Sequence, residues 1–132
     1  MDRLELRTKF ASRIEPFRLE EFGVSVFLRR LSGLARAKLQ FISQDLNGKG
    51  TNNPQEILDF QCKVIAEGLV DEAGTRLYGD DELAAIATEI PGVAIDPIAT
   101  KILKISSPEV AANVEQLTKN SEAIPSADSP TA

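Results

Sequence analysis

Residues 22–39 of this chain read FGVSVFLRRLSGLARAKL, and this stretch decides the fold. Its first half places Val24, Val26 and Leu28 at every second position. A period of two is typical of a half-buried strand. Leu-Ser-Gly ends the alternation, and Ser32 can cap a following helix because its hydroxyl accepts a backbone N–H. The stretch therefore predicts a strand that leads directly into a helix.

The residues before this strand predict its partner. Phe17 and Leu19 alternate with charged residues, and Gly23 lies between the two alternating runs. Glycine adopts backbone angles that other residues resist, which suits a tight turn between antiparallel strands. We therefore expect a β-hairpin over about residues 15–30, with its turn within Glu20–Gly23.

Four to five helices are expected after the hairpin, because apolar residues then recur at helical spacing. Their predicted ranges are about 32–46, 54–69, 81–90, 97–105 and 108–117. Asn53-Pro54, Asp80 or Asp81, and Asp96-Pro97 are start signals for the second, third and fourth helices. In the first helix, the residues that fall at helical spacing on the inner side are Leu34, Ala35, Lys38, Phe41, Ile42 and Leu46.

The remaining segments complete an α+β fold. NGKGTNNP (47–54) predicts a loop, and 70–82 predicts a turn with a bend at Ala73-Gly74. Residues 1–13 fit either a strand or a frayed helix. Residues 119–132 have little apolar content, so burial there would not offset the entropy lost on ordering. We expect a mostly helical single domain over 1–118 with an N-terminal hairpin, followed by a flexible C-terminal tail.

The charge of the chain is unevenly distributed. The net charge is −5, but residues 1–40 hold nine Lys and Arg against five Asp and Glu. The remaining residues hold six against fifteen. Such asymmetry can steer self-association or docking to a charged partner, while the overall negative charge argues against nucleic acid.

Membrane partners and secretion are not expected either. No apolar run approaches the ~20 residues of a spanning helix, and MDRLELRTKF lacks the apolar core of a signal peptide. We therefore expect a cytoplasmic protein.

Catalytic and metal-binding chemistry has little support in this sequence. The chain contains no histidine and one cysteine, Cys62, which lies in an apolar pattern and is expected to be a buried small hydrophobe. NGKGTNNP lacks the glycine spacing and Lys-Ser/Thr pair of a phosphate-binding loop. The acids of 71–82 lack the alternating ligands of a calcium loop, and they are expected to serve turns and helix starts. We expect no enzyme activity, no cofactor and no metal.

Binding of another protein is the function that the residues favour. The basic residues Arg29, Arg30, Arg36 and Lys38 form either a solvated face or a docking face for an acidic partner, including the acidic half of a second copy. Our hypothesis places the partner surface on the hairpin and the first helix, where apolar and basic residues mix. Its residues are Val24, Val26, Phe27, Arg29, Arg30 and Phe41.

Two sequence blocks, in this order, resemble the tail assembly chaperones of bacteriophages with long, flexible, non-contractile tails. The first block matches V-x-V-R-x-L-S-G/T at Val24, Val26, Arg29, Leu31, Ser32 and Gly33. The second matches G-L-V-D-E-x-G-x-x-L-F-x-D at Gly68, Leu69, Val70, Asp71, Glu72, Gly74, Leu77 and Asp80, with Tyr78 in place of Phe. The resemblance extends over residues ~17 to ~105, most of the chain expected to be ordered. Phe22 stands where family members often have Trp.

The resemblance implies a role in virion morphogenesis as a late protein of the host cytoplasm. Such a chaperone holds the helical tape measure protein soluble, helps to recruit major tail protein and forms a homo-oligomer. It is absent from the finished virion, and family members are often also made as a longer frameshifted product. Two other classes stay open: a small adaptor or regulatory module of the bacterial cytoplasm, and a minor tail or connector protein of the virion.

Overall fold

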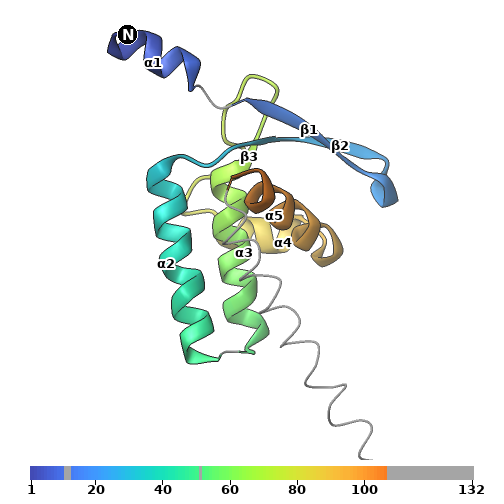
Figure 1. The fold of residues 1–132 in the computed structure, drawn as a ribbon. Helices are drawn as coiled ribbons and strands as arrows, with labels where there is room; N and C mark the ends of the chain where they lie inside the picture. Colours follow the sequence, from blue (N-terminus) through green and yellow to red (C-terminus); the bar gives the residue numbers. More distant parts are fainter. Residues whose placement is uncertain (11–12, 51, 107–132) are drawn as a thin grey trace, which may run out of the picture.

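The predicted hairpin is present and crosses one end of a pair of helices (Figure 1). The computed structural model describes residues 1–10, 13–50 and 52–106. In it, β1 (Ile14–Leu19) pairs antiparallel with β2 (Val24–Arg29) through the turn η1 (Glu20–Phe22). Gly23 has a φ of 64° at the end of this turn, which explains why glycine stands there.

A third strand joins the hairpin to the helical part. β3 (Leu69–Val70) pairs antiparallel with β2, so that Leu28 lies opposite Leu69 and Phe27 opposite Val70. Val70 also bridges to Arg76 across the bend that Ala73-Gly74 predicted. The first arm of that bend, β3, therefore belongs to a three-stranded sheet, and the α+β class is confirmed.

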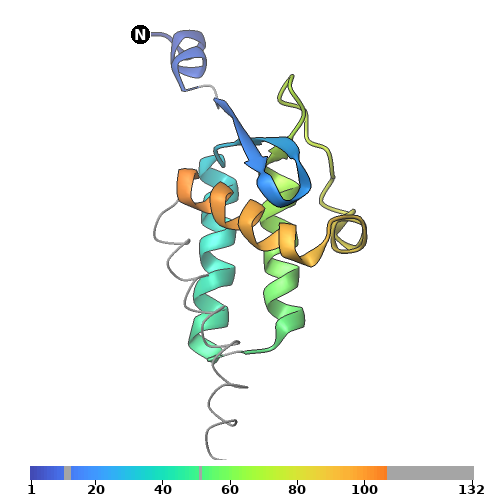
Figure 2. The ribbon, with the colours of Figure 1, turned by 90° about the vertical axis from the view of Figure 1, so that its right-hand side faces the viewer.

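Five helices lie within the described residues. They are α1 (Arg3–Lys9), α2 (Gly33–Lys49), α3 (Pro54–Gly68), α4 (Leu83–Glu89) and α5 (Gly92–Ser106). Figure 2 shows α2 and α3 side by side with α5 crossing them. α3 lies at the centre of the fold, because α2, α4 and α5 all contact it.

The core forms where α3, α5 and the sheet meet. Its most deeply buried large side chains are Leu28, Phe60, Val64, Ile65, Val70, Ile86, Ile95, Ile98, Ile102 and Leu103. At roughly 1.5–3 kcal/mol for each large apolar side chain removed from water, this cluster supplies the main stabilisation of the fold. The hydroxyl of Ser106 at the end of α5 also accepts a hydrogen bond from Leu31 N–H at 2.9 Å, next to the start of α2.

Two helix starts agree with their predicted caps. The Ser32 hydroxyl accepts the N–H of Ala35 at 3.2 Å, and α2 follows directly. The Asn53 side chain accepts the N–H of Gln55 at 2.9 Å at the start of α3. Each cap satisfies an N–H group that the first turn of a helix leaves without a partner.

The end of α2 and the start of α4 were placed incorrectly by the sequence. α2 continues through Lys49 instead of ending near residue 46, because the left-handed backbone that stops it is at Gly50, with a φ of 62°. α4 starts at Leu83, and its cap residue Glu82 makes no capping hydrogen bond through its side chain. Asp80 binds Arg76 instead, so the predicted capping by Asp80 or Asp81 is wrong.

α5 starts at Gly92, five residues before the predicted start, and contains Pro97. Proline removes one hydrogen bond from the second turn, but the apolar face of α5 is buried on both sides of it. Asp96 does not cap the helix: its Oδ1 accepts a hydrogen bond from Gln61 Nε2 of α3 at 2.9 Å. Packing against α3 therefore overrides the local start signal.

The apolar side of α2 also differs from the prediction. Ala35, Leu39, Ser43 and Leu46 face the core, whereas Leu34 and Phe41 are 68% and 72% exposed. Near the N-terminus, Arg3–Lys9 form a helix rather than a strand, with the Asp2 side chain accepting the N–H of Glu5 at 2.8 Å. The helix predicted over 108–117 and the tail predicted over 119–132 lie outside the described residues.

Candidate protein-interaction surfaces

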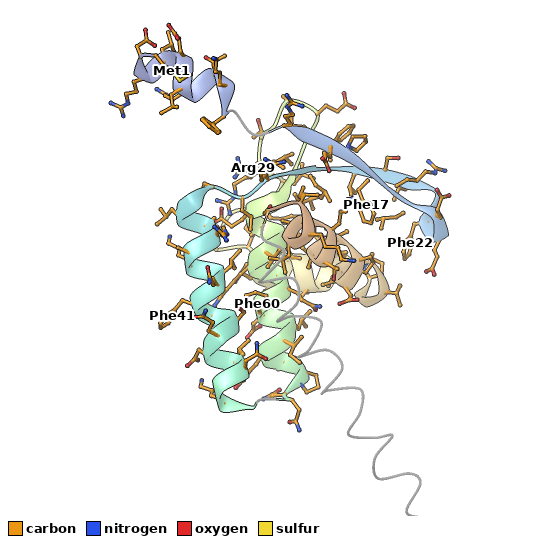
Figure 3. All side chains as sticks on the ribbon, viewed as in Figure 1. Met1, Phe17, Phe22, Arg29, Phe41 and Phe60 are labelled. Carbon is orange, nitrogen blue, oxygen red and sulfur yellow. The ribbon has the colours of Figure 1, made fainter. Side chains whose placement is uncertain are left out.

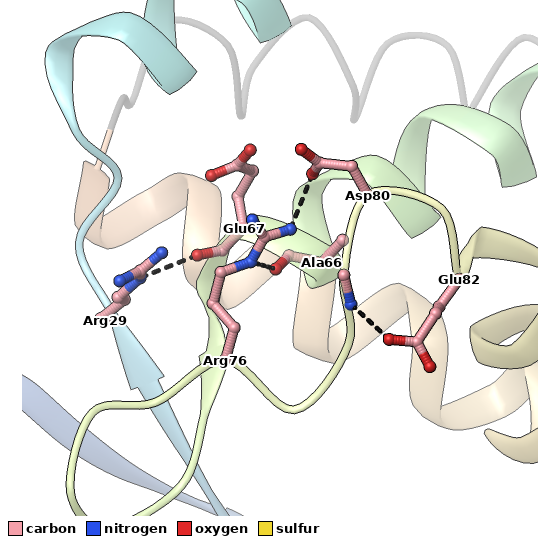
Figure 4. A network of polar contacts seen from close by, with 7 residues as sticks. Arg29, Ala66, Glu67, Arg76, Asp80 and Glu82 are labelled. Atoms are coloured by element: carbon pink, nitrogen blue, oxygen red, sulfur yellow. Dashed lines mark hydrogen bonds and ion pairs between the residues drawn. The ribbon is translucent and has the colours of Figure 1, made fainter.

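Two arginines cap the C-terminal end of α3. Arg29 Nε donates to the carbonyl oxygen of Glu67 at 2.9 Å, and Arg76 Nε donates to that of Ala66 at 2.6 Å (Figure 4). Carbonyls in the last turn of a helix have no partner within it, and that end carries a partial negative charge. Positively charged donors are therefore well suited to both positions. One arginine comes from the hairpin and the other from the 71–82 turn.

The turn that supplies Arg76 is itself held by acidic side chains. Asp71 Oδ1 accepts the N–H groups of Ala73 and Thr75, both at 2.9 Å, and Glu82 Oε1 accepts that of Gly79 at 2.9 Å. Arg76 Nη2 donates to Asp80 Oδ1 at 2.7 Å, which is the main reason that the pKa of Asp80 is lowered. The acids of this segment thus shape a turn, as the sequence predicted.

The two blocks behind the family resemblance meet at this end of α3. β2 of the first block pairs with β3 of the second, and Arg29 reaches the residue just before Gly68. Gly68 packs so closely on α5 that an added Cβ would lie 2.5 Å from Ile102 Cγ2. The blocks therefore form one structural unit that joins the hairpin, α3 and α5.

The six residues predicted as a partner surface do not form one surface. Val24 is 47% exposed near the tip of the hairpin, while Val26 and Phe27 are half-buried. Arg29 points toward the core side and caps α3, whereas Phe41 is exposed on α2 (Figure 3). Arg30 is exposed beyond the end of β2. The structure brings Val24 and Val26 together and separates them from Phe41.

Val24 and Val26 line an apolar groove of about 420 Å³. We call it the hairpin groove; its lining is Leu19, Phe22, Val24, Val26, Leu69, Leu77, Tyr78, Glu89, Ile90, Pro91, Ala94 and Ile98. Phe22, at the hairpin tip in Figure 3, is 40% exposed, and Leu77 is 51% exposed. Exposed apolar side chains grouped around a hollow are typical of a protein-binding site. The hypothesised partner surface did not include Phe22, from the turn of the same hairpin, or Leu77, from the 71–82 turn.

The rim of the hairpin groove is acidic. Glu89 is the one charged side chain among its described lining residues, and Glu20 and Glu21 flank Phe22 in the adjoining hollow. Arg18 is also there, but it pairs with Glu20 at 3.5 Å. The pKa of Tyr78 is raised by burial, then by a hydrogen bond to Glu89 and by the charges of Glu89 and Glu82. The groove therefore suits an apolar segment with basic residues beside it.

A second apolar surface lies on the outer side of α2. Leu34, Ala37 and Phe41 are all exposed and occupy positions i, i+3 and i+7, which share one face of a helix. We call these three residues the α2 stripe. At 100° per residue they lie nearly opposite the buried Ala35, Leu39 and Leu46. Because α2 is apolar on both sides, its outer side can receive another helix.

The third exposed apolar element is α1. None of its residues is buried, and Met1, Leu4, Leu6 and Phe10 are between 47% and 79% exposed. Figure 1 shows α1 beyond the start of β1, away from the rest of the molecule. A helix of seven residues is marginal on its own in water, so contact with a partner would stabilise it.

The part of the chain that the structure describes contains neither a cluster of metal-binding side chains nor a membrane-spanning helix. Within those residues no three His, Cys, Asp or Glu side chains are grouped so as to hold a metal ion. Among the same residues, no helix combines the length and the apolar character needed to cross a membrane.

Cys62 is expected to be unreactive in the native protein. It is 2% exposed, and the pKa of its thiol is raised by burial and, to a lesser degree, by the charge of Asp59. At pH 8 we expect a soluble thiol reagent to modify it at least ~100-fold more slowly than in denaturant, since the thiolate is the reacting form and local opening is required. Absorbance of the released product measures both rates, and equal rates would contradict the predicted burial.

Comparison with known proteins gives a match among the solved structures. No family model matches the sequence, and no curated protein matches it. The tail assembly chaperone of bacteriophage HK97 matches in structure, with a TM-score of 0.55 and 20% sequence identity. The match covers 78% of this chain and 97% of that chain. This chain therefore has the fold of a bacteriophage tail assembly chaperone, as the two sequence blocks predicted.

Proposed function

We propose that this protein is a non-enzymatic chaperone that acts during assembly of a long, non-contractile bacteriophage tail. The observation that carries the proposal is the fold, which corresponds to 97% of the HK97 chaperone chain. The two sequence blocks support it independently, because they were matched to the same family from the residues alone. The expected setting is the host cytoplasm, late in infection, and the protein is expected to be absent from purified virions.

The proposed partners are the tape measure protein and the major tail protein, and the proposed contact for the former is the α2 stripe. Leu34 and Phe41 are two turns apart on one helix face and are 68% and 72% exposed. Apolar residues at this spacing pack against another helix. Lys38, also exposed on α2, lies beside them and can bind an acidic residue of the partner. A long helical tape measure would cover this face.

Co-expression with the tape measure protein of the same phage tests the function and the surface together. With the wild-type chain we expect the tape measure protein to become soluble and to co-purify. Phe41→Asp replaces the largest apolar side chain of the α2 stripe with a charge, so we expect at least about a tenfold loss of co-purified tape measure. Ala87→Asp is the matched control, because it adds the same charge at an exposed position of α4 and should change nothing.

The outcomes separate the two parts of the proposal. If the tape measure stays insoluble with the wild-type chain, the chaperone function is wrong. If it becomes soluble and Phe41→Asp binds as well as wild type, the function holds and the α2 stripe is wrong. Mass spectrometry of purified particles then distinguishes a chaperone, which should be missing, from a virion component.

A further inference from the structure

We infer that α1 of one molecule binds in the hairpin groove of a second copy of this chain. This is a contact between two different surfaces: an N-terminal arm on the donor and the groove on the acceptor. It does not depend on the proposed function, because it concerns this chain alone. Three observations carry it.

The first observation is that the described part of the chain leaves α1 exposed, so that a partner would stabilise it. It buries none of its residues, and a seven-residue helix is shorter than the ~12–15 residues at which isolated helices become stable in water. It is a suitable length to lie in a groove, since seven residues span about 10 Å. Among the described residues, α1 is thus a formed helix whose apolar side chains are all exposed.

The second observation is that one face of α1 has the chemistry that the groove requires. Leu6 and Phe10 are at i and i+4, so they lie on the same side of the helix. Arg3 and Arg7 fall next to them at 100° per residue. Two apolar side chains can therefore enter the groove between Phe22 and Leu77, while the arginines approach Glu89 and the acids of the hairpin tip. Met1 and Leu4 lie on the other side of α1.

The third observation is the placement of the two surfaces at opposite ends of the hairpin. α1 precedes Ile14, at the start of β1, whereas Leu19, Phe22 and Val24 of the groove are at the turn end. Figure 1 shows α1 directed away from that end. This arrangement favours a groove on a neighbouring molecule. Since donor and acceptor surfaces differ, the contact is heterologous and repeats from copy to copy unless a ring closes.

Sedimentation velocity of the full chain over a range of concentrations tests the inference. We expect the wild type to form species larger than a dimer as the concentration rises. The double variant Leu6→Asp/Phe10→Asp disrupts the apolar face of α1, and Leu77→Asp disrupts the hairpin groove. Each should lower the association constant at least about 100-fold. Leu4→Asp, on the opposite side of α1, is the matched control and should assemble like wild type. Because α1 buries nothing and Leu77 is 51% exposed, none of these changes removes core packing.

Mixing the two damaged proteins gives the decisive result. The Leu6→Asp/Phe10→Asp protein retains its groove and the Leu77→Asp protein retains its arm. Each should be monomeric alone, and together they should form a 1:1 dimer that does not grow, because only one contact remains. A wild type that stays monomeric, or variants that assemble like wild type, would overturn the inference. So would a mixture that shows no dimer. None of these results bears on whether the tape measure protein is bound.

Discussion

Replacement of Gly68 by alanine is expected to lower the free energy of unfolding by about 1–3 kcal/mol. The new Cβ would lie 2.5 Å from Cγ2, 2.8 Å from Cδ1 and 2.9 Å from Cγ1 of Ile102. Ile102 is completely buried, and its branched Cβ restricts rotation away from the clash. α3 and α5 would have to separate at their closest approach. Urea unfolding monitored by circular dichroism measures the loss.

Gly48→Ala is the matched control, and its expected effect has the opposite sign. Gly48 lies within α2, and an added Cβ would meet no atom within 4 Å. Alanine is favoured over glycine inside a helix, so we expect a gain of up to about 1 kcal/mol. A loss at Gly48 as large as that at Gly68 would show that close packing is not the cause.

A double-mutant cycle isolates the contact between Gly68 and Ile102. Ile102→Ala removes all three atoms that the new Cβ would meet, although alone it costs about 2–5 kcal/mol through the cavity. Gly68→Ala/Ile102→Ala should therefore be less destabilised than the two single effects predict, by at least about 0.5 kcal/mol. Additive losses would show that the Ile102 contact is not the cause of the Gly68→Ala effect. The cause would then lie elsewhere, for example in the backbone where α3 continues into β3.

Removal of either arginine at the end of α3 is expected to have an effect of similar size. Arg29→Met and Arg76→Met should each lower the free energy of unfolding by about 1.5–3 kcal/mol, as expected for a hydrogen bond from a charged donor. Methionine retains an apolar stem, so the loss is mainly that of the donor to Glu67 or Ala66. Lysine should restore little of it, because an ammonium group lacks the planar fork of the guanidinium.

Arg18→Met is the control for the arginine series. Arg18 pairs with Glu20 at 3.5 Å, and the two side chains are 56% and 82% exposed. An exposed ion pair contributes about 0–1 kcal/mol, so its loss should be small. If all three arginines gave the same small change, the capping interpretation would be wrong. The series also bears on partner binding: weaker binding by an Arg29 variant must first be corrected for unfolding.

Much of the secondary structure could be predicted because its causes are local. The alternation around Gly23 defined a hairpin, and the side chains of Ser32 and Asn53 satisfy N–H groups two or three residues away. The burial of Cys62 also followed from its apolar surroundings. In each case the cause lies within a few residues of the effect, so that local propensity and capping were sufficient.

The six residues of the hypothesised partner surface are not grouped in the fold. Val24 and Val26 line one groove, whereas Phe41 is exposed on α2. Arg29 had been assigned to the surface from its charge, whereas it caps α3. Charge shows that an arginine needs a partner, and only the fold shows whether that partner is within the same chain.

The sequence by itself determined the α+β class, the hairpin, the starts of α2 and α3, and the two blocks that indicate the chaperone fold. Only the tertiary structure decided which side of α2 is buried, where α5 begins, and that Phe22 and Leu77 line the same groove. It also decided that the described part of the fold leaves every residue of α1 exposed. The physical reason is the range of the interactions: turns and caps act over a few residues, whereas burial depends on segments that approach one another only after folding.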